Sequence, residues 1–332
     1  MLDPSLELAD LHIHVGAAVA PHILWSIAHD QGFKLPVQTY WEFRDLVTAK
    51  PETVSSLADY LAILHHWTEK IQSSPAAIER SVYEVIGKEF RSSGVSLIEL
   101  RFNPMKRNLG GERDLDHIIH AALRGMDRAC LEYGVRAGLI FCLAREFSLE
   151  LNEIIVKKAV KYKSRGVVGI DLAGPESHTL ELGHEVAGYR DLFARARAAS
   201  LGTTVHTGET AYTAAPGVLA VLKELAPSRI GHGVAAANSE EAMAKLVESG
   251  TVLEICPSSN LRTHAVEDLH ELGSALAAFE AAGVRYTINT DGPYLLNTHL
   301  RREYQMLLDA QLITDAQAER SVAVARAATF VR

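Results

Sequence analysis

The length, composition and charge of this chain exclude several classes of protein. Its 332 residues, 48% of them hydrophobic and 22% charged, are typical of a globular chain that can bury one large core. A formal net charge of −8 argues against nucleic acid or an acidic membrane surface as a partner.

Cysteine usage and the N-terminal residues give an expectation about location. Cys130, Cys142 and Cys256 are far apart and form no CxxC pair, so we expect neither a disulfide framework nor a cysteine zinc site. Residues 1–11 carry three acidic and no basic residues, unlike a signal peptide, and no apolar run approaches membrane-spanning length. These features predict a cytoplasmic protein with no membrane partner.

The first predicted strand covers residues 6–15 and contains His12-Ile13-His14. Alternation along a strand places these two histidines on one face. A helical pattern follows at residues 21–31. Residues 40–70 look helical but irregular, with no strand among them, so a helical insertion at about residues 36–74 is expected after the first strand.

From residue 75 onward, helical and strand patterns alternate regularly. The predicted helices are 75–91, 115–133, 149–162, 185–199, 217–225, 239–248 and 272–282, and the strands that follow them are 95–102, 135–143, 167–172, 203–206, 229–234, 252–256 and 285–289. Two further helices, 299–310 and 314–329, end the chain. Several helices stop at a glycine, and the strands are continuous apolar runs, as in parallel sheets covered on both faces.

Eight β/α repeats predict the α/β class and a single (β/α)8 TIM-type barrel, with residues 1–332 forming one domain. An open doubly wound sheet is the alternative. The first strand is not followed by the glycine-rich phosphate turn that such a sheet often carries.

Polar residues and glycines stand at the ends of six predicted strands, where barrel enzymes carry their active sites. The segments are His12-Ile13-His14, Asp171-Leu172-Ala173-Gly174, His206-Thr207-Gly208-Glu209, Gly231-His232-Gly233, Glu254-Ile255-Cys256-Pro257 and Asn289-Thr290-Asp291-Gly292. Three histidines and one carboxylate match a zinc site that keeps one position open for water. Each segment alone has a simpler interpretation, such as a chance histidine pair, a helix cap or, for Cys256, a small buried hydrophobe. The pair His65-His66 is interpreted as solvated or packed.

These segments resemble the motifs of the adenosine deaminase family of the amidohydrolase superfamily. The matching stretches are Leu11–His14, Gly169–Gly174, His206–Glu209, Arg229–Gly233, Glu254–Asn260 and Asn289–Asp291, and their order fits the family from near residue 10 to near residue 330. The resemblance implies one zinc ion per chain, bound by His12, His14, His206 and Asp291. A lysine after strand four, typical of binuclear relatives, is missing from Val168-Gly169-Ile170-Asp171.

The resemblance also implies catalytic and substrate-binding roles. Glu209 would protonate a purine ring nitrogen, and His232 would orient and deprotonate the attacking water, with Asp291 a further catalytic group. The implied substrate contacts are His14, the backbone amide of Gly174, and an apolar wall formed by Tyr60, Leu61 and Leu64. The implied activity is zinc-dependent deamination of a 6-aminopurine nucleoside, adenosine by default.

Two glycines depart from the family pattern at substrate-contacting positions. Gly16 replaces an aspartate that holds the ribose 5′-hydroxyl, and Gly292 replaces an aspartate on the purine N7 side. His178 or Asn297 could take over the contacts of the missing aspartates. We expect the glycines to make room and to relax discrimination, so that 5′-substituted nucleosides react at least as well as adenosine.

Other functions stay open. A nucleoside with a larger 5′ group, such as 6-aminodeoxyfutalosine, and the free base adenine are alternative substrates. A zinc- and ligand-binding barrel without turnover is disfavoured by Glu209 and His232, which a binding protein does not need. A hydrolase of amides or phosphate esters would need a different acid–base arrangement. The sequence leaves the oligomeric state open.

Overall fold

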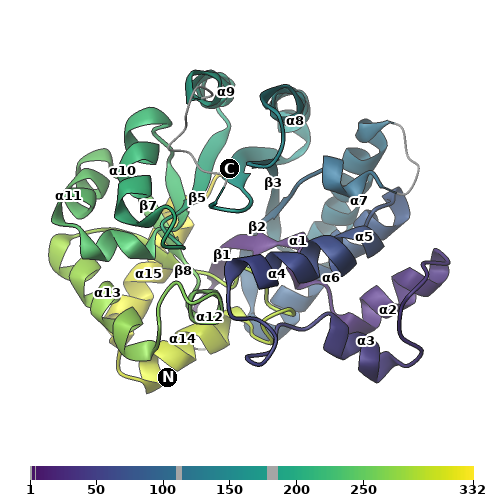
Figure 1. The fold of residues 1–332 in the computed structure, drawn as a ribbon, viewed down its shortest axis with the longest axis horizontal. Coiled ribbons are helices and arrows are strands. Elements are labelled where there is room, and N and C mark those ends of the chain that lie inside the picture. The colour runs from purple at the N-terminus through teal and green to yellow at the C-terminus, as the bar shows by residue number, and fades with distance from the viewer. Residues whose placement is uncertain (1, 4, 110–113, 178–185) are drawn as a thin grey trace.

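The computed structural model describes residues 2–3, 5–109, 114–177 and 186–332, and its centre is one parallel sheet of eight strands. The strands pair in chain order, β1 to β8, as expected for a barrel (Figure 1). They are β1 Leu8–His14, β2 Val95–Phe102, β3 Arg136–Ala144, β4 Val167–Ala173, β5 Gly202–Thr207, β6 Arg229–His232, β7 Val252–Ile255 and β8 Tyr286–Ile288. The predicted (β/α)8 architecture is confirmed.

The first and last strands meet at a single bridge between Ile13 and Asp291. The backbone N–H of His14 donates to the carbonyl of Asp291 at 2.8 Å, and the N–H of Asp291 donates to the carbonyl of His12, also at 2.8 Å. The barrel therefore closes at its C-terminal rim. This closure brings residues nearly 280 positions apart in sequence into one site.

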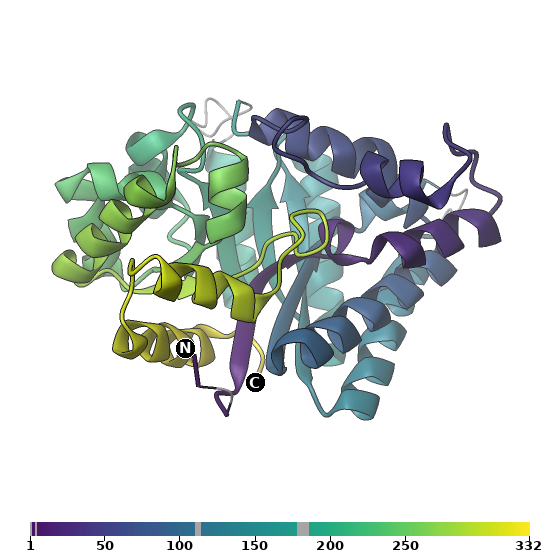
Figure 2. The same ribbon diagram turned by 90° about the horizontal axis from the view of Figure 1, so that it is seen from below.

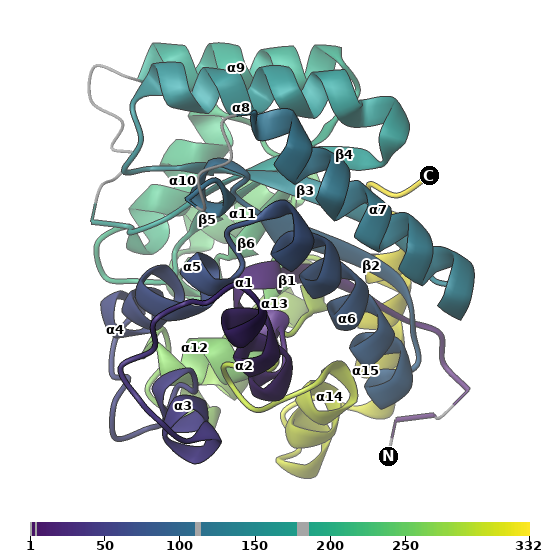
Figure 3. The same cartoon turned by 90° about the vertical axis from the view of Figure 1, so that its right-hand side faces the viewer.

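Helices form an outer layer around the strands. They are α6 Pro75–Ser93, α7 Leu115–Tyr133, α8 Leu149–Tyr162, α9 Val186–Ala198, α10 Ala214–Glu224, α11 Glu240–Ser249, α13 Leu269–Ala282, α14 Leu300–Asp309 and α15 Asp315–Ala328. Helices α6 to α9 follow one another around the outside of the barrel (Figure 3). Two helices, α7 and α8, have the predicted bounds because Asp114 and Ser148 cap their first turns.

Several short helical turns join these elements. They are η2 Met105–Arg107, η3 Lys163–Arg165, η4 Val234–Asn238 and α12 Pro257–Arg262. The pattern of hydrophobic residues does not predict them, because a turn of three to six residues is shorter than the window of about 11–18 residues over which periodicity is read. The predicted helix 185–199 begins one residue outside the described part of the chain.

The insertion after β1 covers the C-terminal ends of the strands. After α1 Val15–Ala18 and α2 Pro21–Asp30, its elements are α3 Tyr40–Leu46, α4 Leu57–Ile63, the π-helical turn η1 Leu64–Thr68 and α5 Glu69–Ile71. Figure 2 shows this dark blue segment at one end of the barrel and both chain termini at the other. Among the described residues, none of the helices has the length and apolar character needed to cross a membrane.

Candidate active site

A pocket opens at the C-terminal ends of the strands, beneath the insertion. Strand ends form one wall, and α4, η1, α5 and η2 form the other. The predicted site residues that line it are His14, Gly16, Tyr60, Leu61, Leu64, Gly174, His206, Glu209, His232 and Asp291.

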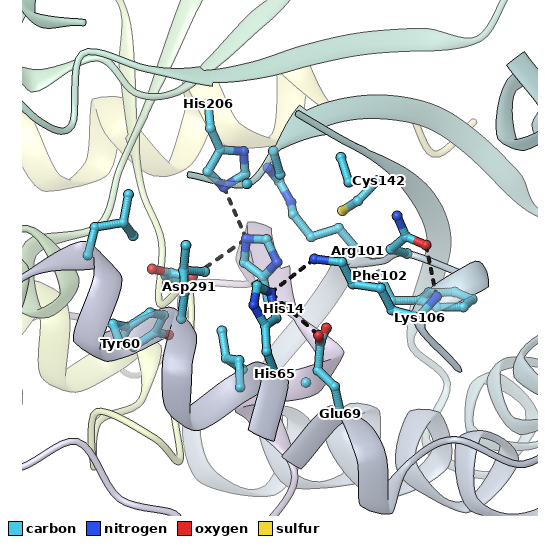
Figure 4. Close-up of a pocket in the computed structure, with 18 of the residues that line it drawn as sticks. His14, Tyr60, His65, Glu69, Arg101, Phe102, Lys106, Cys142, His206 and Asp291 are labelled. Atoms are coloured by element: carbon cyan, nitrogen blue, oxygen red, sulfur yellow. Dashed lines mark hydrogen bonds and ion pairs between the residues drawn. The ribbon is translucent and has the colours of Figure 1, made fainter. Parts of the chain in front are cut away.

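Three histidines and an aspartate converge at the floor of this pocket. The Nε2 atoms of His14 and His206 lie 3.0 Å apart, and His14 Nε2 lies 3.7 Å from Asp291 Oδ1 (Figure 4). His12 Nε2 lies 4.0 Å from the same carboxylate oxygen and is buried without a hydrogen-bond partner. Ligand atoms gathered this closely match what a metal ion requires.

Two of these rings are fixed from behind by carboxylates. His12 Nδ1–H donates to Glu254 Oε2 at 2.8 Å, and His206 Nδ1–H donates to Asp171 Oδ1 at 3.0 Å. Each contact leaves the Nε2 lone pair facing the centre of the site. Carboxylates that orient metal-binding histidines in this way are a regular feature of zinc sites.

The protonation of the histidines also fits a metal. Burial lowers the pKa of His12 and His14 well below the usual value, and nearby Arg101 and His206 add to the effect. Both rings are therefore neutral at pH 7, the form in which imidazole binds metals. The donor set of His12, His14, His206 and Asp291 fits one zinc ion.

Asp291 and His232 each have a strained backbone conformation. Their φ angles are 59° and 60°, in the left-handed region that residues with side chains rarely occupy. Asp291 Oδ2 accepts a hydrogen bond of 2.5 Å from the hydroxyl of Ser259. Strain held at two site residues is typical of functional positions, where the surrounding contacts impose the conformation.

Glu209 lies in a buried environment that favours its protonated form. Burial raises the pKa of its carboxyl well above 4.5, and the neighbouring Glu176 and Asp291 raise it further. Thr263 donates to Glu209 Oε1 at 3.0 Å, while Oε2 lies 3.5 Å from His232 Nε2. A carboxylic acid with a raised pKa can supply a proton near neutral pH.

Contacts around Asn260 set the tautomer of His232. The amide oxygen of Asn260 accepts the backbone N–H of Cys256 at 3.3 Å, so its amide nitrogen donates to His232 Nδ1 at 3.0 Å. Burial lowers the pKa of His232, followed by the effect of His206, so the ring is neutral. Its hydrogen must then lie on Nε2, which faces Glu209 and the pocket.

The two unusual glycines leave no empty space, contrary to our expectation. A Cβ atom at Gly16 would lie 3.0 Å from Arg107 Nη2 and 3.2 Å from Glu69 Cγ. One at Gly292 would overlap the hydroxyl of Tyr60 and lie 2.7 Å from Ala17 Cβ. Side chains from other elements therefore fill both positions, and the predicted extra room is wrong.

The far wall of the pocket is charged, which the sequence did not reveal. Arg107 Nη1 lies 2.7 Å from Glu69 Oε1, and Lys106 Nζ contacts Glu146 Oε1 at 2.5 Å and His65 Nε2 at 3.0 Å. Tyr60, Leu61 and Leu64, which were predicted as an apolar wall, line the pocket beside these charged residues, and so does His65, which was interpreted as solvated or packed. A signal was available for Lys106, Arg107 and Glu146, because they follow the ends of β2 and β3, where no site was sought.

Gly174 lies at the end of β4 in a conformation that requires glycine. Its φ is 104°, and a Cβ atom there would overlap the carboxylate of Glu146. The position lines the pocket, as its predicted role demands. Of the two proposed substitutes for the missing aspartates, Asn297 lies outside the pocket lining and His178 lies outside the described residues.

A (β/α)8 barrel whose strand ends gather histidines, an aspartate and a glutamate with a raised pKa has the arrangement of a metal-dependent hydrolase. The family model described as adenosine deaminase matches residues 7–331. The adenosine deaminase of Shewanella denitrificans is 30% identical, with 96% of this chain and 92% of that protein covered. The adenosine deaminase of Enterococcus faecalis is 33% identical, covering 91% and 86%. The chain therefore belongs to the adenosine deaminase family and is a hydrolytic deaminase acting on carbon–nitrogen bonds.

Solved structures share this fold at lower identity. An adenine deaminase from Arthrobacter aurescens has a TM-score of 0.84 at 20% identity, covering 98% of this chain and 94% of that one. A zinc-bound amidohydrolase from Burkholderia ambifaria also has 0.84 at 20%, covering 99% and 87%. The Arabidopsis protein ADAL in complex with IMP has 0.80 at 23%, covering 98% and 93%.

Proposed function

We propose that this chain is a zinc-dependent hydrolytic deaminase of a 6-aminopurine nucleoside, releasing ammonia and the 6-oxo product. Membership of the adenosine deaminase family supports an aminopurine as the substrate. The observation that carries the proposal is the convergence of His12, His14, His206 and Asp291 beside the buried acid Glu209.

Zinc is the metal that the donor set fits best. Neutral imidazoles and one carboxylate are common zinc ligands, and a structural neighbour carries bound zinc. A bound zinc ion supplies a Lewis acid and lowers the pKa of a water molecule to about 7. We propose one ion per chain, held by His12, His14, His206 and Asp291, because the two groups of possible ligands found among the described residues, His12-His14-His206 and His12-His232-Asp291, share His12.

Glu209 is proposed as the proton donor to the substrate ring. Loss of an amino group from an aromatic carbon requires that ring conjugation be broken, and negative charge then builds on the adjacent ring nitrogen. A protonated carboxyl next to that nitrogen removes the charge by general acid catalysis. The raised pKa of Glu209 keeps this proton available at neutral pH.

His232 is proposed to orient the attacking water through its Nε2–H group. The hydrogen bond from Asn260 occupies Nδ1, so the neutral ring offers a donor, and no lone pair, to the pocket. This tautomer supports the orienting half of the predicted role. It gives no support to proton removal by the same nitrogen.

The backbone N–H of Gly174 is proposed to contact a further ring nitrogen, and Leu61 and Leu64 to cover the ring from the insertion. All three residues line the pocket. His14 is proposed to contact both the metal and the substrate, since its side chain, at 21% exposed, is the most exposed of the proposed metal ligands.

A second candidate is a 6-aminopurine nucleoside with an anionic group at its 5′ end. Arg107 is buried, ion-paired with Glu69 and adjacent to Gly16, where adenosine deaminases hold the 5′-hydroxyl. Lys106 adds a second cation to this wall. The ADAL structure with IMP is a fold-level neighbour that binds such an anion. A 5′-phosphate and the carboxylate of 6-aminodeoxyfutalosine both have this chemistry.

Ammonia release by the zinc-loaded protein tests both candidates. We expect turnover of 6-aminopurine compounds and none of aminopyrimidines, with adenosine, AMP, 6-aminodeoxyfutalosine and adenine compared by kcat/KM. Asp291→Ala should lose zinc and activity together, while metal analysis of the wild type should give one zinc per chain. Two metals per chain, or an active Asp291→Ala protein with full zinc, would contradict the proposed centre.

A further inference from the structure

Tyr60 brings a polar group into a wall that was predicted to be apolar. It lies on α4, the residue is 3% exposed, and it lines the pocket. Its hydroxyl is buried and has no hydrogen-bond partner. A hydroxyl that lines a pocket and has no protein partner is available to a group on a bound ligand.

The position of this hydroxyl depends on the glycine at 292. The oxygen occupies the volume that a Cβ atom at Gly292 would need, so any other residue there would displace it. In Figure 4, Tyr60 lies on the same side of the pocket as Asp291, away from Glu69 and Lys106. The hydroxyl thus lies next to the proposed metal ligand, close to where the reacting carbon must sit.

The chemistry of a 6-aminopurine limits what this hydroxyl can contact. The reacting carbon is flanked by N1 on one side and by the carbon that joins N7 on the other. Glu209 serves N1 in the proposed function, which leaves N7 as the acceptor nearest to the reacting carbon. A phenol at neutral pH carries a hydrogen that it can donate.

We infer that Tyr60 is a specificity-determining residue whose hydroxyl donates a hydrogen bond to N7 of the purine. The inference rests on the proposed function. It assigns to the insertion, and not to a strand end, the contact that distinguishes a purine from a ring lacking this acceptor.

The test compares the best 6-aminopurine nucleoside with its 7-deaza analogue, in which N7 is replaced by a C–H group. The wild type should prefer the parent compound by about tenfold in kcat/KM, the value of one neutral hydrogen bond. Tyr60→Phe should lower kcat/KM for the parent by about tenfold and leave the 7-deaza analogue unchanged, so that the preference disappears. Equal losses on both compounds, or no loss on either, would overturn the inference.

Two controls separate this role from a structural one. The 3-deaza analogue should respond to Tyr60→Phe as the parent does, because its N7 is intact. Tyr304→Phe removes a hydroxyl that is bonded to Ser321 at 3.2 Å, outside the pocket lining, so it should lower stability and leave the 7-deaza preference unchanged. Tyr60→Phe removes an unpartnered hydroxyl and should leave the melting temperature equal or higher. A clear fall in the Tyr60→Phe melting temperature would indicate a structural role and contradict the inference.

A binding experiment keeps the inference testable if turnover fails. Inosine and 7-deazainosine are product-like and need no reaction, so their dissociation constants can be measured with the zinc-loaded protein. Tighter binding of inosine in the wild type only would support the Tyr60 contact. Failure of ammonia release from every aminopurine would instead reject the proposed function. Equal affinities for both ligands in wild type and Tyr60→Phe would reject the contact alone.

Discussion

The two walls of the pocket are built in different ways. The strand-end wall, with His12, His206 and Asp291, rests on the barrel and on buried carboxylates that fix the rings. The insertion wall comes from helices of three to seven residues, and side chains such as His65 remain partly exposed. The difference indicates that the barrel fixes the catalytic residues. Substitutions in the insertion can therefore alter substrate specificity without disturbing those residues.

Arg101 explains the rigidity of the strand-end wall. It is fully buried and donates to Asp171 at 3.2 Å and to Glu254 at 2.9 Å, the two carboxylates behind the histidines. Although burial alone would raise the pKa of both carboxyls, the adjacent cation contributes to lowering them. Both carboxylates therefore stay ionised and keep accepting from the rings. Among the described residues of the insertion wall, no comparable hydrogen-bond network reaches the proposed metal ligands.

The largest expected effect is that of Glu209→Gln. Glutamine cannot donate the same proton, so kcat should fall by about 10² to 10⁴ with zinc still bound. Leu61→Ala on the insertion wall should act mainly on KM and change kcat less than tenfold. Near-normal kcat in Glu209→Gln, or an equal loss of kcat in Leu61→Ala, would break the division between the two walls.

The dependence of the rate on pH follows from the same carboxyl. Because the pKa of Glu209 is raised by burial, its acid form is lost only when pH rises through that higher value. The wild-type kcat should therefore fall on the alkaline side. This decline should be absent in Glu209→Gln, and a decline that persists there belongs to another group.

Glu254→Gln should have the next largest effect. The amide no longer matches the ionised partner of His12 and Arg101, so zinc affinity should fall by about 10- to 100-fold, measured by competition with a chelator. The control is Glu89→Gln, a buried carboxylate on α6 that contacts Lys88 and no histidine. Unchanged affinity in Glu254→Gln would show that the ring needs no support from this carboxylate.

The strand-end wall is also the part that the sequence predicted well. The bounds of β2, α7 and α8 agree with their patterns because capping residues and long apolar runs act locally. The motif segments follow strand ends, and parallel strands bring those ends together. His12, His14, His206, Glu209, His232 and Asp291 could therefore be named, although their roles remain predictions.

The rest of the pocket depends on contacts between segments far apart in the chain, which no local sequence pattern indicates. Arg101 meets Glu254 across 153 positions of sequence, and nothing in either segment indicates the other. The filling of the Gly292 position depends on the exact approach of Tyr60 from α4, a helix in an irregular region. Sequence shows that a side chain is missing at 16 and 292, but only packing shows what replaces it.

His232 offers a smaller and more selective test. If its Nε2–H orients water, His232→Gln keeps a donor and should retain about tenfold more activity than His232→Ala. If the ring removes a proton, neither variant can do so, and both should lose activity equally. Rates measured under saturating substrate, with zinc content checked, distinguish the two outcomes.

The smallest effects concern the two glycines, which border the insertion wall differently. At Gly292 a methyl group meets the ring end of Tyr60 and Ala17, both buried, so Gly292→Ala should cost about 1–3 kcal/mol of unfolding free energy. At Gly16 it lies 3.0–3.3 Å from Arg107 Nη2, Glu69 Cγ and Leu64 Cδ2, so its neighbours need to move less and Gly16→Ala should cost less. Urea unfolding of both zinc-loaded variants measures the difference. Displacement of Tyr60 should also reduce the 7-deaza preference in Gly292→Ala and leave it intact in Gly16→Ala. Equal costs and equal preferences would mean that the insertion yields at both positions and that Tyr60 is not held in place by Gly292.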